Sequence, residues 1–341
     1  MRFIAEKHPR GEYIHLNRLL SFRAQIFAVI GAKGYGKTYR CKRYAVKRFI
    51  YQRQQMTIIR DTEAALQKLK ASDGESFFND IMRAEPLCRH EAKFDGDAII
   101  IDGEHAGQVM ALSSFAKYKG NAYSLGTILF DEFIPERTQI RRGDPAYQFL
   151  ITCDTFIRDN PRTRVLLTAN SLDIGSPILE LLGVRIKDKQ YGYYYNPEKR
   201  AVVYYAPNSP EFTQRRANSL AFTLARGTQY EGSVSENAFG GSIARIYTKR
   251  EQCDLYGIYY THDGDCFRLY KAQGKSLYYV TKDPNPNSNL YMRYTFDLGQ
   301  VGVNRQYAPK GEQDKLRKLF LSGKIEFESN YILSRFLTVI E

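Results

Sequence analysis

Eight residues near the start of the chain have the types and the spacing of a phosphate-binding loop. They match the pattern G-x-x-x-x-G-K-[ST] and read Gly31, Ala32, Lys33, Gly34, Tyr35, Gly36, Lys37, Thr38. Glycines allow the tight turns that point successive backbone N–H groups at a phosphate. We expect Lys37 to reach the β- and γ-phosphates and the Thr38 hydroxyl to bind Mg²⁺. The loop therefore predicts a nucleoside triphosphate site; the alternative is a glycine-rich turn without a ligand.

The residues on either side of this loop predict the elements that hold it. The apolar run Gln25–Ile30 is typical of a buried strand. Residues 38–51 have helical spacing and contain neither Pro nor Gly. A helix that begins at the loop adds its positive N-terminal end to the phosphate site. Strand, loop and helix follow one another in the order that the motif requires.

A second apolar run ends in two acidic residues. It covers Thr127–Phe130 and is followed by Asp131 and Glu132. Buried parallel strands carry such side chains to the carboxyl edge of a sheet, where α/β proteins bind ligands. We expect Asp131 to hold Mg²⁺, directly or through water, and Glu132 to orient and deprotonate the attacking water. Together with the loop, this pattern is typical of ATPases that use a glutamate base.

A third apolar run, Arg164–Ala169, ends in Asn170. There Asn170 is a candidate sensor beside the γ-phosphate; the alternative is an asparagine that caps the next turn. Three arginines lie at or just before this run: Arg158, Arg162 and Arg164. Arginine stabilises a phosphoryl group in transfer, often from a neighbouring subunit. Spacing alone does not choose among the three, and a solvated basic turn is the alternative.

The remaining pattern predicts further elements and a second module. Helical spacing favours helices at 13–20, 63–70, 76–83, 211–226, 313–321 and 330–340. Alternation and turn residues favour strands at 56–60, 98–103, 108–112, 191–195, 201–205, 255–260, 266–270 and 276–281. Tyrosines crowd the hairpin of 191–205, which has a predicted five-residue loop; they could stack on bases or simply pack. A proline pair at 207 and 210 marks a boundary, and a compact α+β module begins near residue 232.

Composition restricts the class of protein. The 341 residues are 43% hydrophobic, with neither an apolar run that could span a bilayer nor a signal-peptide pattern, so we expect a cytosolic protein. The five cysteines lack metal-site spacing, which argues against a zinc site. The net charge is +13, and residues 1–230 hold 35 basic and 24 acidic side chains. Such a surface attracts polyanions, although a soluble basic protein would also have it.

The sequence resembles a known family, the DNA-packaging ATPases of small tailed phages, phi29 and its relatives. Four segments carry the resemblance: GAKGYGKTY at 31, NAYSLGTILFDEFI at 121–134, DTFIRDNPRTR at 154–164 and ARGTQYEG at 225–232. They occur in the family's order and at similar spacing. The resemblance covers nearly the whole chain and is weaker after residue 240.

The resemblance implies a ring motor, usually a homopentamer, that docks on the portal of an empty prohead and drives viral double-stranded DNA inward with ATP and Mg²⁺. It implies an α/β P-loop NTPase (ASCE-type) domain with a mainly parallel sheet at 1–207 and a helical linker at 208–231. Residues 232–341 would form a smaller α+β domain like an RNase H-like nuclease that has lost its active site; in some relatives it contacts a packaging RNA. The protein would be in the host cytoplasm, transiently at the portal vertex, absent from the mature virion and without a membrane partner.

By position, the resemblance also assigns two residues that act across a subunit interface. Arg158 matches the family's arginine finger, and Lys119 matches a lysine that approaches the neighbour's nucleotide. Arg162 remains an alternative finger. Asp61 follows Arg60 where the family can have a second arginine, so the role of position 61 stays open.

Two alternatives of a different kind remain at this stage. One is a terminase with an active nuclease domain, which needs three or four converging carboxylates. The candidates are Asp254, Asp263 and Asp265, and later strands offer few acids. The other is a nucleotide-gated nucleic-acid-binding adaptor that switches without sustained turnover.

Overall fold

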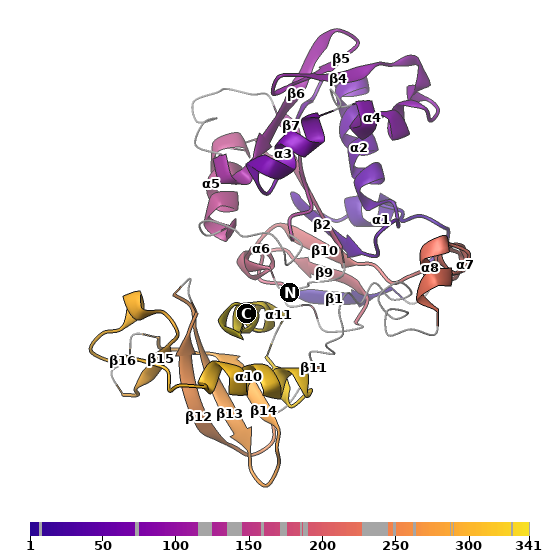
Figure 1. The fold of residues 1–341 in the computed structure, drawn as a ribbon. Coiled ribbons are helices and arrows are strands. Elements are labelled where there is room, and N and C mark those ends of the chain that lie inside the picture. The colour runs from indigo at the N-terminus through magenta and orange to yellow at the C-terminus, as the bar shows by residue number, and fades with distance from the viewer. Residues whose placement is uncertain are drawn as a thin grey trace. The chain divides into compact units, whose positions relative to one another are not determined.

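The computed structural model describes most of the chain. The described residues are 1–6, 9–71, 75–114, 125–134, 145–157, 160–170, 176–184, 186, 190–226, 245–247, 250–261, 264–286, 288, 290–328 and 330–340. The chain divides into two compact units: residues 1–172, 177–184 and 190–239, and residues 173–176, 185–189 and 240–341. Each unit has its own sheet (Figure 1).

The larger unit is built on a ten-stranded sheet. Its described strands, in spatial order, are β1 (Arg2–Ala5), β9 (Gly192–Asn196), β10 (Ala201–Tyr205), β2 (Ile26–Gly31), β8 (Arg164–Asn170), β7 (Leu125–Asp131), β3 (Gln55–Arg60), β6 (Glu104–Ala111), β5 (Ala98–Ile101) and β4 (Ala92–Asp95). The run from β10 to β6 is parallel, and antiparallel strands extend it at both ends. The loop strand β2 and the acidic strand β7 are therefore separated by β8.

Helices cover both faces of this sheet (Figure 1). Those described in the larger unit are α1 (Asn17–Leu20), α2 (Lys37–Gln52), α3 (Glu63–Lys70), α4 (Glu75–Met82), the 3₁₀ helix η1 (Leu87–Arg89), α5 (Pro145–Ile157), α6 (Pro177–Leu181), α7 (Pro210–Ala217) and α8 (Leu220–Ala225). Alternate residues of β7 face opposite sides: Leu129 joins the core cluster with α2, whereas Phe130 packs on Phe149 of α5, with ring centroids 6.3 Å apart. The α/β fold with a mainly parallel sheet is thus confirmed.

One predicted helix is wrong in its continuity. Residues 211–226 form α7 and α8 rather than one helix. The break lies at Ser219, whose backbone is extended (ψ 148°) and whose hydroxyl accepts a hydrogen bond from the Phe222 N–H. A serine in this role starts a new helix, because it satisfies an N–H group that the first turn leaves unpaired. Spacing of apolar residues alone did not show this.

The tyrosine hairpin is confirmed, with a loop one residue shorter than predicted. β9 ends at Asn196 and β10 begins at Ala201, so residues 197–200 connect them. Tyr193 and Tyr204 are buried and stack with ring centroids 4.3 Å apart. Packing, rather than stacking on bases, accounts for these two side chains.

The smaller unit has a seven-stranded mixed sheet. Its described strands, in spatial order, are β11 (Arg245–Ile246), β17 (Ile325–Phe327), β14 (Tyr278–Lys282), β13 (Cys266–Ala272), β12 (Cys253–Tyr260), β15 (Arg293–Thr295) and β16 (Arg305–Tyr307). Its described helices are the 3₁₀ helix η3 (Leu298–Gln300), α10 (Glu312–Leu321) and α11 (Asn330–Ile340). Phe336 of α11 packs on Phe267 and Phe327 of the sheet. The predicted second module is confirmed as a smaller sheet domain, and its likeness to RNase H-like nucleases stays a prediction.

Candidate nucleotide-binding site

The predicted phosphate-binding loop connects β2 to α2. Gly34 and Gly36 have φ of +82° and +84°, a conformation that other residues rarely adopt. A Cβ on Gly36 would also lie 3.2 Å from Tyr13 Cδ1. Gly36 is the N-cap of α2, so the first N–H groups of the helix face the loop. The local backbone thus has the features that an anion site at a helix N-terminus needs.

Lys37 lies beneath this loop with its side chain 5% exposed. Its Nζ donates to the carbonyls of Gly31 and Ala32, both at 2.7 Å, and to Asn170 Oδ1 at 3.1 Å. The structure therefore brings together the lysine and the candidate sensor, which are 133 residues apart. Burial lowers the pKa of the Lys37 ammonium to about 8, and the nearby Asp131 carboxylate opposes that shift. A buried cation held only by neutral oxygens is well suited to exchange them for phosphate.

Thr38 and Asp131 form the oxygen cluster expected of a magnesium site. The Thr38 hydroxyl donates to Asp131 Oδ1 at 2.6 Å, and Asp131 is 2% exposed. Thr168 of β8 also donates its hydroxyl to Asp131 Oδ1. Hydroxyl and carboxylate oxygens are ligands that Mg²⁺ takes in nucleotide sites. These donors fit the metal that the sequence predicts, and Thr168 is a residue of the site that sequence reasoning did not single out.

Glu132 leaves the strand in an unusual conformation. Its φ is +59°, which is strained for a residue with a side chain, and its carboxylate is more than half exposed. Arg60, at the carboxyl end of β3, donates to Glu132 Oε2 at 2.7 Å and pairs with Asp131 Oδ2 at 2.9 Å. One guanidinium thus holds both acids. Position 60 therefore faces the acids, whereas Asp61, whose role was open, is a buried residue beside it.

The candidate residues of a subunit interface are described only in part. Arg158 and Lys119 lie outside the described residues. Arg162 is exposed at the amino edge of the sheet. Arg164 is engaged within the chain, since it donates to the Leu20 carbonyl at 3.3 Å and lies over the Phe27 ring. Of the two described arginines, Arg162 is the one with an exposed side chain.

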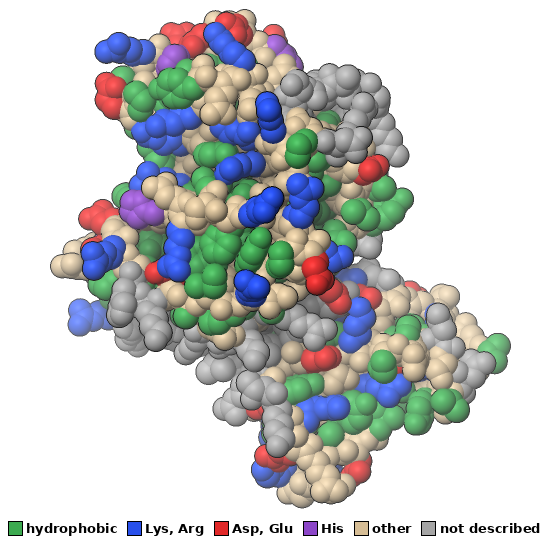
Figure 2. Space-filling model, turned by 180° about the vertical axis from the view of Figure 1, so that it is seen from behind, with side chains coloured by type: hydrophobic (Ala, Val, Ile, Leu, Met, Phe, Trp, Pro, Cys, Tyr) green, Lys and Arg blue, Asp and Glu red, His purple; other side chains and the backbone are tan. Residues whose placement is uncertain are grey.

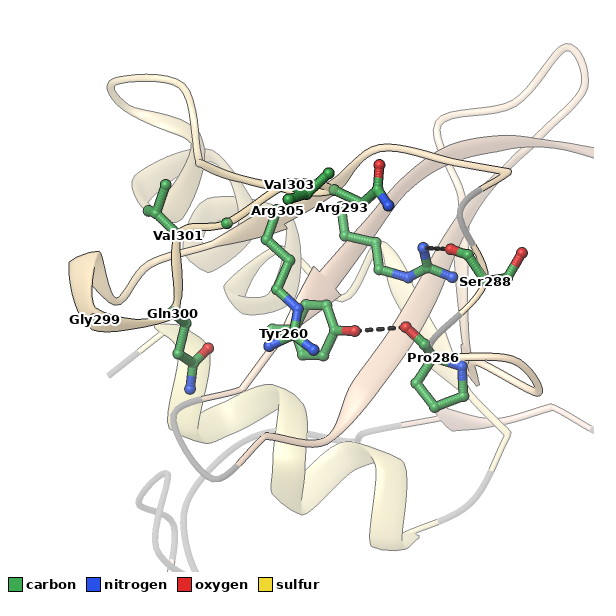
Figure 3. A pocket seen from close by; sticks show the side chains of 11 residues that line it. Tyr260, Pro286, Ser288, Arg293, Gly299, Gln300, Val301, Val303 and Arg305 are labelled. Carbon is green, nitrogen blue, oxygen red and sulfur yellow. Dashed lines mark hydrogen bonds between the residues drawn. The ribbon is translucent and has the colours of Figure 1, made fainter.

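The described residues of the smaller unit form a pocket but no cluster of metal ligands. Gln273 donates to Asp254, Arg335 pairs with Asp265 at 2.5 Å, and Asp263 lies outside the described residues. No group of three His, Cys, Asp or Glu side chains that could hold a metal ion occurs in the described part of the chain. A pocket of about 490 Å³ lies where Arg305 covers the Tyr260 ring, 4.1 Å from its centroid (Figure 3).

The buried arginine of this pocket is occupied within the unit. Arg293 is 1% exposed, pairs with Asp283 and donates to the Asn285 carbonyl. It also donates to the Ser288 carbonyl (Figure 3). These contacts hold Asp283, Asn285 and Ser288 around one buried guanidinium. The converging acids, lysine and asparagine of the larger unit make the phosphate-binding loop the stronger candidate site.

Basic side chains that contribute to the net charge of +13 are visible on the surface (Figure 2). On the face shown in Figure 2, Lys and Arg side chains are spread over the larger unit rather than gathered in one block. Among the described residues no helix has the length and apolar character needed to cross a bilayer.

Comparison with known proteins agrees with this geometry. The chain matches the family described as Podovirus DNA encapsidation protein (Gp16) over residues 10–337. The DNA packaging protein of Bacillus phage B103 is 28% identical over 317 residues, which cover 91% of this chain and 95% of that protein. The N-terminal domain of the DNA packaging ATPase from bacteriophage phi29 is similar with a TM-score of 0.52 and 28% identity, covering 59% of this chain and 100% of that one.

The fold of the whole chain also has a counterpart. A chain of the bacteriophage Phi-29 viral genome packaging motor assembly has a TM-score of 0.65 and 23% identity, over 96% of this chain and 100% of that chain. At this identity the similarity concerns the fold, and it extends over both units.

Proposed function

Because the chain belongs to the Podovirus DNA encapsidation protein (Gp16) family, we propose that it hydrolyses ATP to drive viral double-stranded DNA into a preformed prohead. The observation that carries this proposal is the meeting of Lys37, Thr38, Asp131, Glu132 and Asn170 at the carboxyl edge of one parallel sheet. The similarity to packaging proteins of phages supports the DNA as the polymer moved. A net charge of +13 suits such a partner.

Each residue of the site has a defined part in the proposed hydrolysis. Lys37 exchanges the loop carbonyls for β- and γ-phosphate oxygens. Asn170 acts as a sensor that lies beside the γ-phosphate. Thr38 and Asp131 would hold Mg²⁺, which when bound would neutralise charge on the phosphates. Glu132 leaves Arg60 and accepts a proton of the attacking water. The water oxygen bonds to the γ-phosphorus while the bond from this phosphorus to the bridging oxygen of ADP breaks, which gives ADP and phosphate. The Arg60 pair therefore restrains the base until the site is assembled.

The position of the sheet edges supports a finger that acts between subunits. β8 runs from Arg164 to Asn170, so its two ends are about 20 Å apart. Asn160 lies at the amino end, where its carbonyl accepts a hydrogen bond from Gln25. Residue 158 precedes this amino end in the sequence, and we propose that Arg158 serves the nucleotide of the next copy. Lys119 would join it there.

Such head-to-tail contacts form a ring when the rotation between successive copies closes. We propose a homopentamer on the prohead portal, acting in the host cytoplasm and absent from the mature virion, with packaging RNA as a further partner. We also propose residues 1–207 as the ATPase domain, 208–231 as the linker and 232–341 as the second domain.

The proposal is tested by steady-state phosphate release from the purified chain, alone and with prohead, double-stranded DNA or both. A packaging motor should be strongly stimulated only by the two together. A nucleotide-gated adaptor would instead bind nucleic acid in an ATP-dependent way and release almost no phosphate, and that result would overturn the proposal.

ATP affinity should depend on pH through Lys37. With a pKa of about 8, the ammonium is charged at pH 7 and mostly neutral at pH 9. Since only the charged form attracts phosphate, we expect affinity to fall roughly tenfold over this range. The free energy of unfolding should change in the opposite sense. It should rise with pH between the pKa of Lys37 in the folded chain and its higher value in the unfolded chain, because the unfolded chain binds more protons in that range. Titration with a fluorescent ATP analogue at constant ionic strength measures the affinity.

The matched variant for this titration is Lys37→Met, which has no titrating amine. It should bind weakly at both pH values. An equal affinity of the unaltered chain at pH 7 and pH 9 would contradict the assignment of Lys37.

We expect the smaller unit to lack nuclease activity. The two candidate acids that the structure describes, Asp254 and Asp265, are held by Gln273 and Arg335. Incubation of the purified chain with supercoiled plasmid and Mg²⁺ or Mn²⁺ should leave the plasmid intact. Metal-dependent nicking that disappears in Asp254→Asn or Asp265→Asn would favour a cutting terminase.

A further inference from the structure

The outer side of the phosphate-binding loop is held by helix α7. The Arg215 guanidinium donates from Nη2 to the Gly34 carbonyl at 2.7 Å. It also lies over the Tyr13 ring, 4.3 Å from its centroid, and over the Phe212 ring at 5.3 Å. This contact joins residues that are 181 positions apart, and neither the sequence pattern nor the hydrolysis scheme makes use of it.

A second layer of contacts fixes the same loop. The Tyr35 ring is 1% exposed and packs on Phe212, with centroids 4.7 Å apart. The Tyr35 carbonyl accepts a hydrogen bond from the Ile14 N–H at 2.9 Å. Ser209, the N-cap of α7, donates its hydroxyl to the Gly11 carbonyl at 2.6 Å. The N-terminal segment and α7 thus enclose the loop from outside.

The hydrogen bond from Arg215 to the Gly34 carbonyl also affects the N–H groups of the loop. In a loop that cradles an anion, the N–H groups point in and the carbonyls point out. A donor that fixes the Gly34 carbonyl on the outside therefore favours the backbone arrangement that phosphate needs. The charge of the guanidinium makes this hydrogen bond stronger than one between neutral groups.

From these contacts we infer that Arg215 is a positioning residue that holds the phosphate-binding loop ready for ATP and couples nucleotide binding to α7. This inference rests on the proposed function of the loop. Phosphate binding draws the loop amides inward, and the Gly34 carbonyl transmits that change to Arg215. The Arg215 Nε–H is buried without an acceptor among the described residues. A shift of the helix that gave this group an acceptor would therefore be favourable.

The test compares Arg215→Ala and Arg215→Lys with Gln214→Ala, an exposed neighbour on the same helix. We expect Arg215→Ala to bind ADP with Mg²⁺ roughly tenfold more weakly, with kcat changed by less than about threefold. Arg215→Lys keeps the charge and should recover part of the affinity, and Gln214→Ala should match the unaltered chain. A merely structural role would lower the thermal midpoint and the active fraction, but leave the affinity of the folded molecules unchanged.

Hydrogen exchange gives a second measurement on the full chain. Adding ADP with Mg²⁺ should slow exchange of the α7 amides in the unaltered chain, and this effect should disappear in Arg215→Ala. Equal affinity and equal α7 protection in the two proteins would overturn the inference while leaving the proposed function intact. If the unaltered chain binds no nucleotide, the proposed function itself fails.

Discussion

Replacing Arg158 with alanine is expected to lower ATP turnover by about 10³–10⁵-fold, the range over which arginine fingers act in related phosphoryl transfers. The finger neutralises charge that develops on the transferring phosphoryl group, so its loss affects kcat. Nucleotide affinity should change little, because the loop, Lys37 and Thr38 are untouched. Phosphate release with prohead and DNA present, alongside fluorescent-nucleotide binding, measures the two quantities.

Comparison variants identify which arginine acts. Arg162→Ala, which removes an exposed side chain at the amino edge of the sheet, should keep most of the activity. Arg164→Ala should lower stability instead, because it removes the contacts with Leu20 and Phe27. Full turnover by Arg158→Ala, or a loss confined to Arg162→Ala, would move the finger to another residue.

Mixed rings distinguish a finger in trans from one in cis. A Glu132→Gln subunit has a finger but no base, whereas an Arg158→Ala subunit has a base but no finger. If fingers act across the interface, mixing the two inactive proteins restores turnover at sites where a Glu132→Gln finger meets an Arg158→Ala nucleotide. If the finger acts within one chain instead, ATP turnover should not recover at any mixing ratio of the two variants.

Glu132→Gln is expected to bind ATP and to hydrolyse it about 10²–10⁴-fold more slowly, which is the usual contribution of a general base. The amide keeps the shape of the side chain but accepts no proton. Single-turnover hydrolysis and nucleotide binding measure the two effects. Glu104→Gln is a matched control, since it makes the same change at an exposed acid paired with Arg53.

The geometry sets a further condition for this variant. Arg60 pairs with both acids, so Glu132→Gln leaves Asp131 as the charged partner of the guanidinium. The proposed metal ligands Thr38 and Asp131 are unchanged, so binding with Mg²⁺ should stay within a few-fold of the unaltered chain. A near-normal hydrolysis rate in Glu132→Gln would remove this residue from the role of base and leave Asp131 as the remaining acid.

Much of the fold could be predicted because local patterns encode it. The spacing of apolar residues predicted β2 and α2 to within about a residue, and the Arg164–Asn170 strand with both ends correct. Short edge strands such as β1, β11 and β16 were missed. They have few residues, and what makes them strands is their pairing partner rather than their own sequence.

The site was predictable where chemistry is local and not where it depends on neighbouring strands. Lys37, Thr38, Asp131 and Glu132 follow from motifs, because each must lie at the end of a strand or the start of a helix. Arg60 and Thr168 come from strands that flank β7, and only the order β8-β7-β3 brings them to Asp131. Arg215 depends on a helix almost two hundred residues away from the loop.

By itself the sequence determined that this chain has a phosphate-binding loop, a pair of acids after a buried strand and a second module. Only the tertiary structure decided how the two acids work together. In a regular strand, successive side chains point to opposite faces of the sheet, so the carboxylates of Asp131 and Glu132 would point away from each other. The strand ends at Asp131, and the left-handed backbone of Glu132 turns its carboxylate back, where Arg60 of the adjacent strand pairs with both. That conformation is costly for a residue with a side chain and is maintained by the packed sheet around it, which no local pattern records.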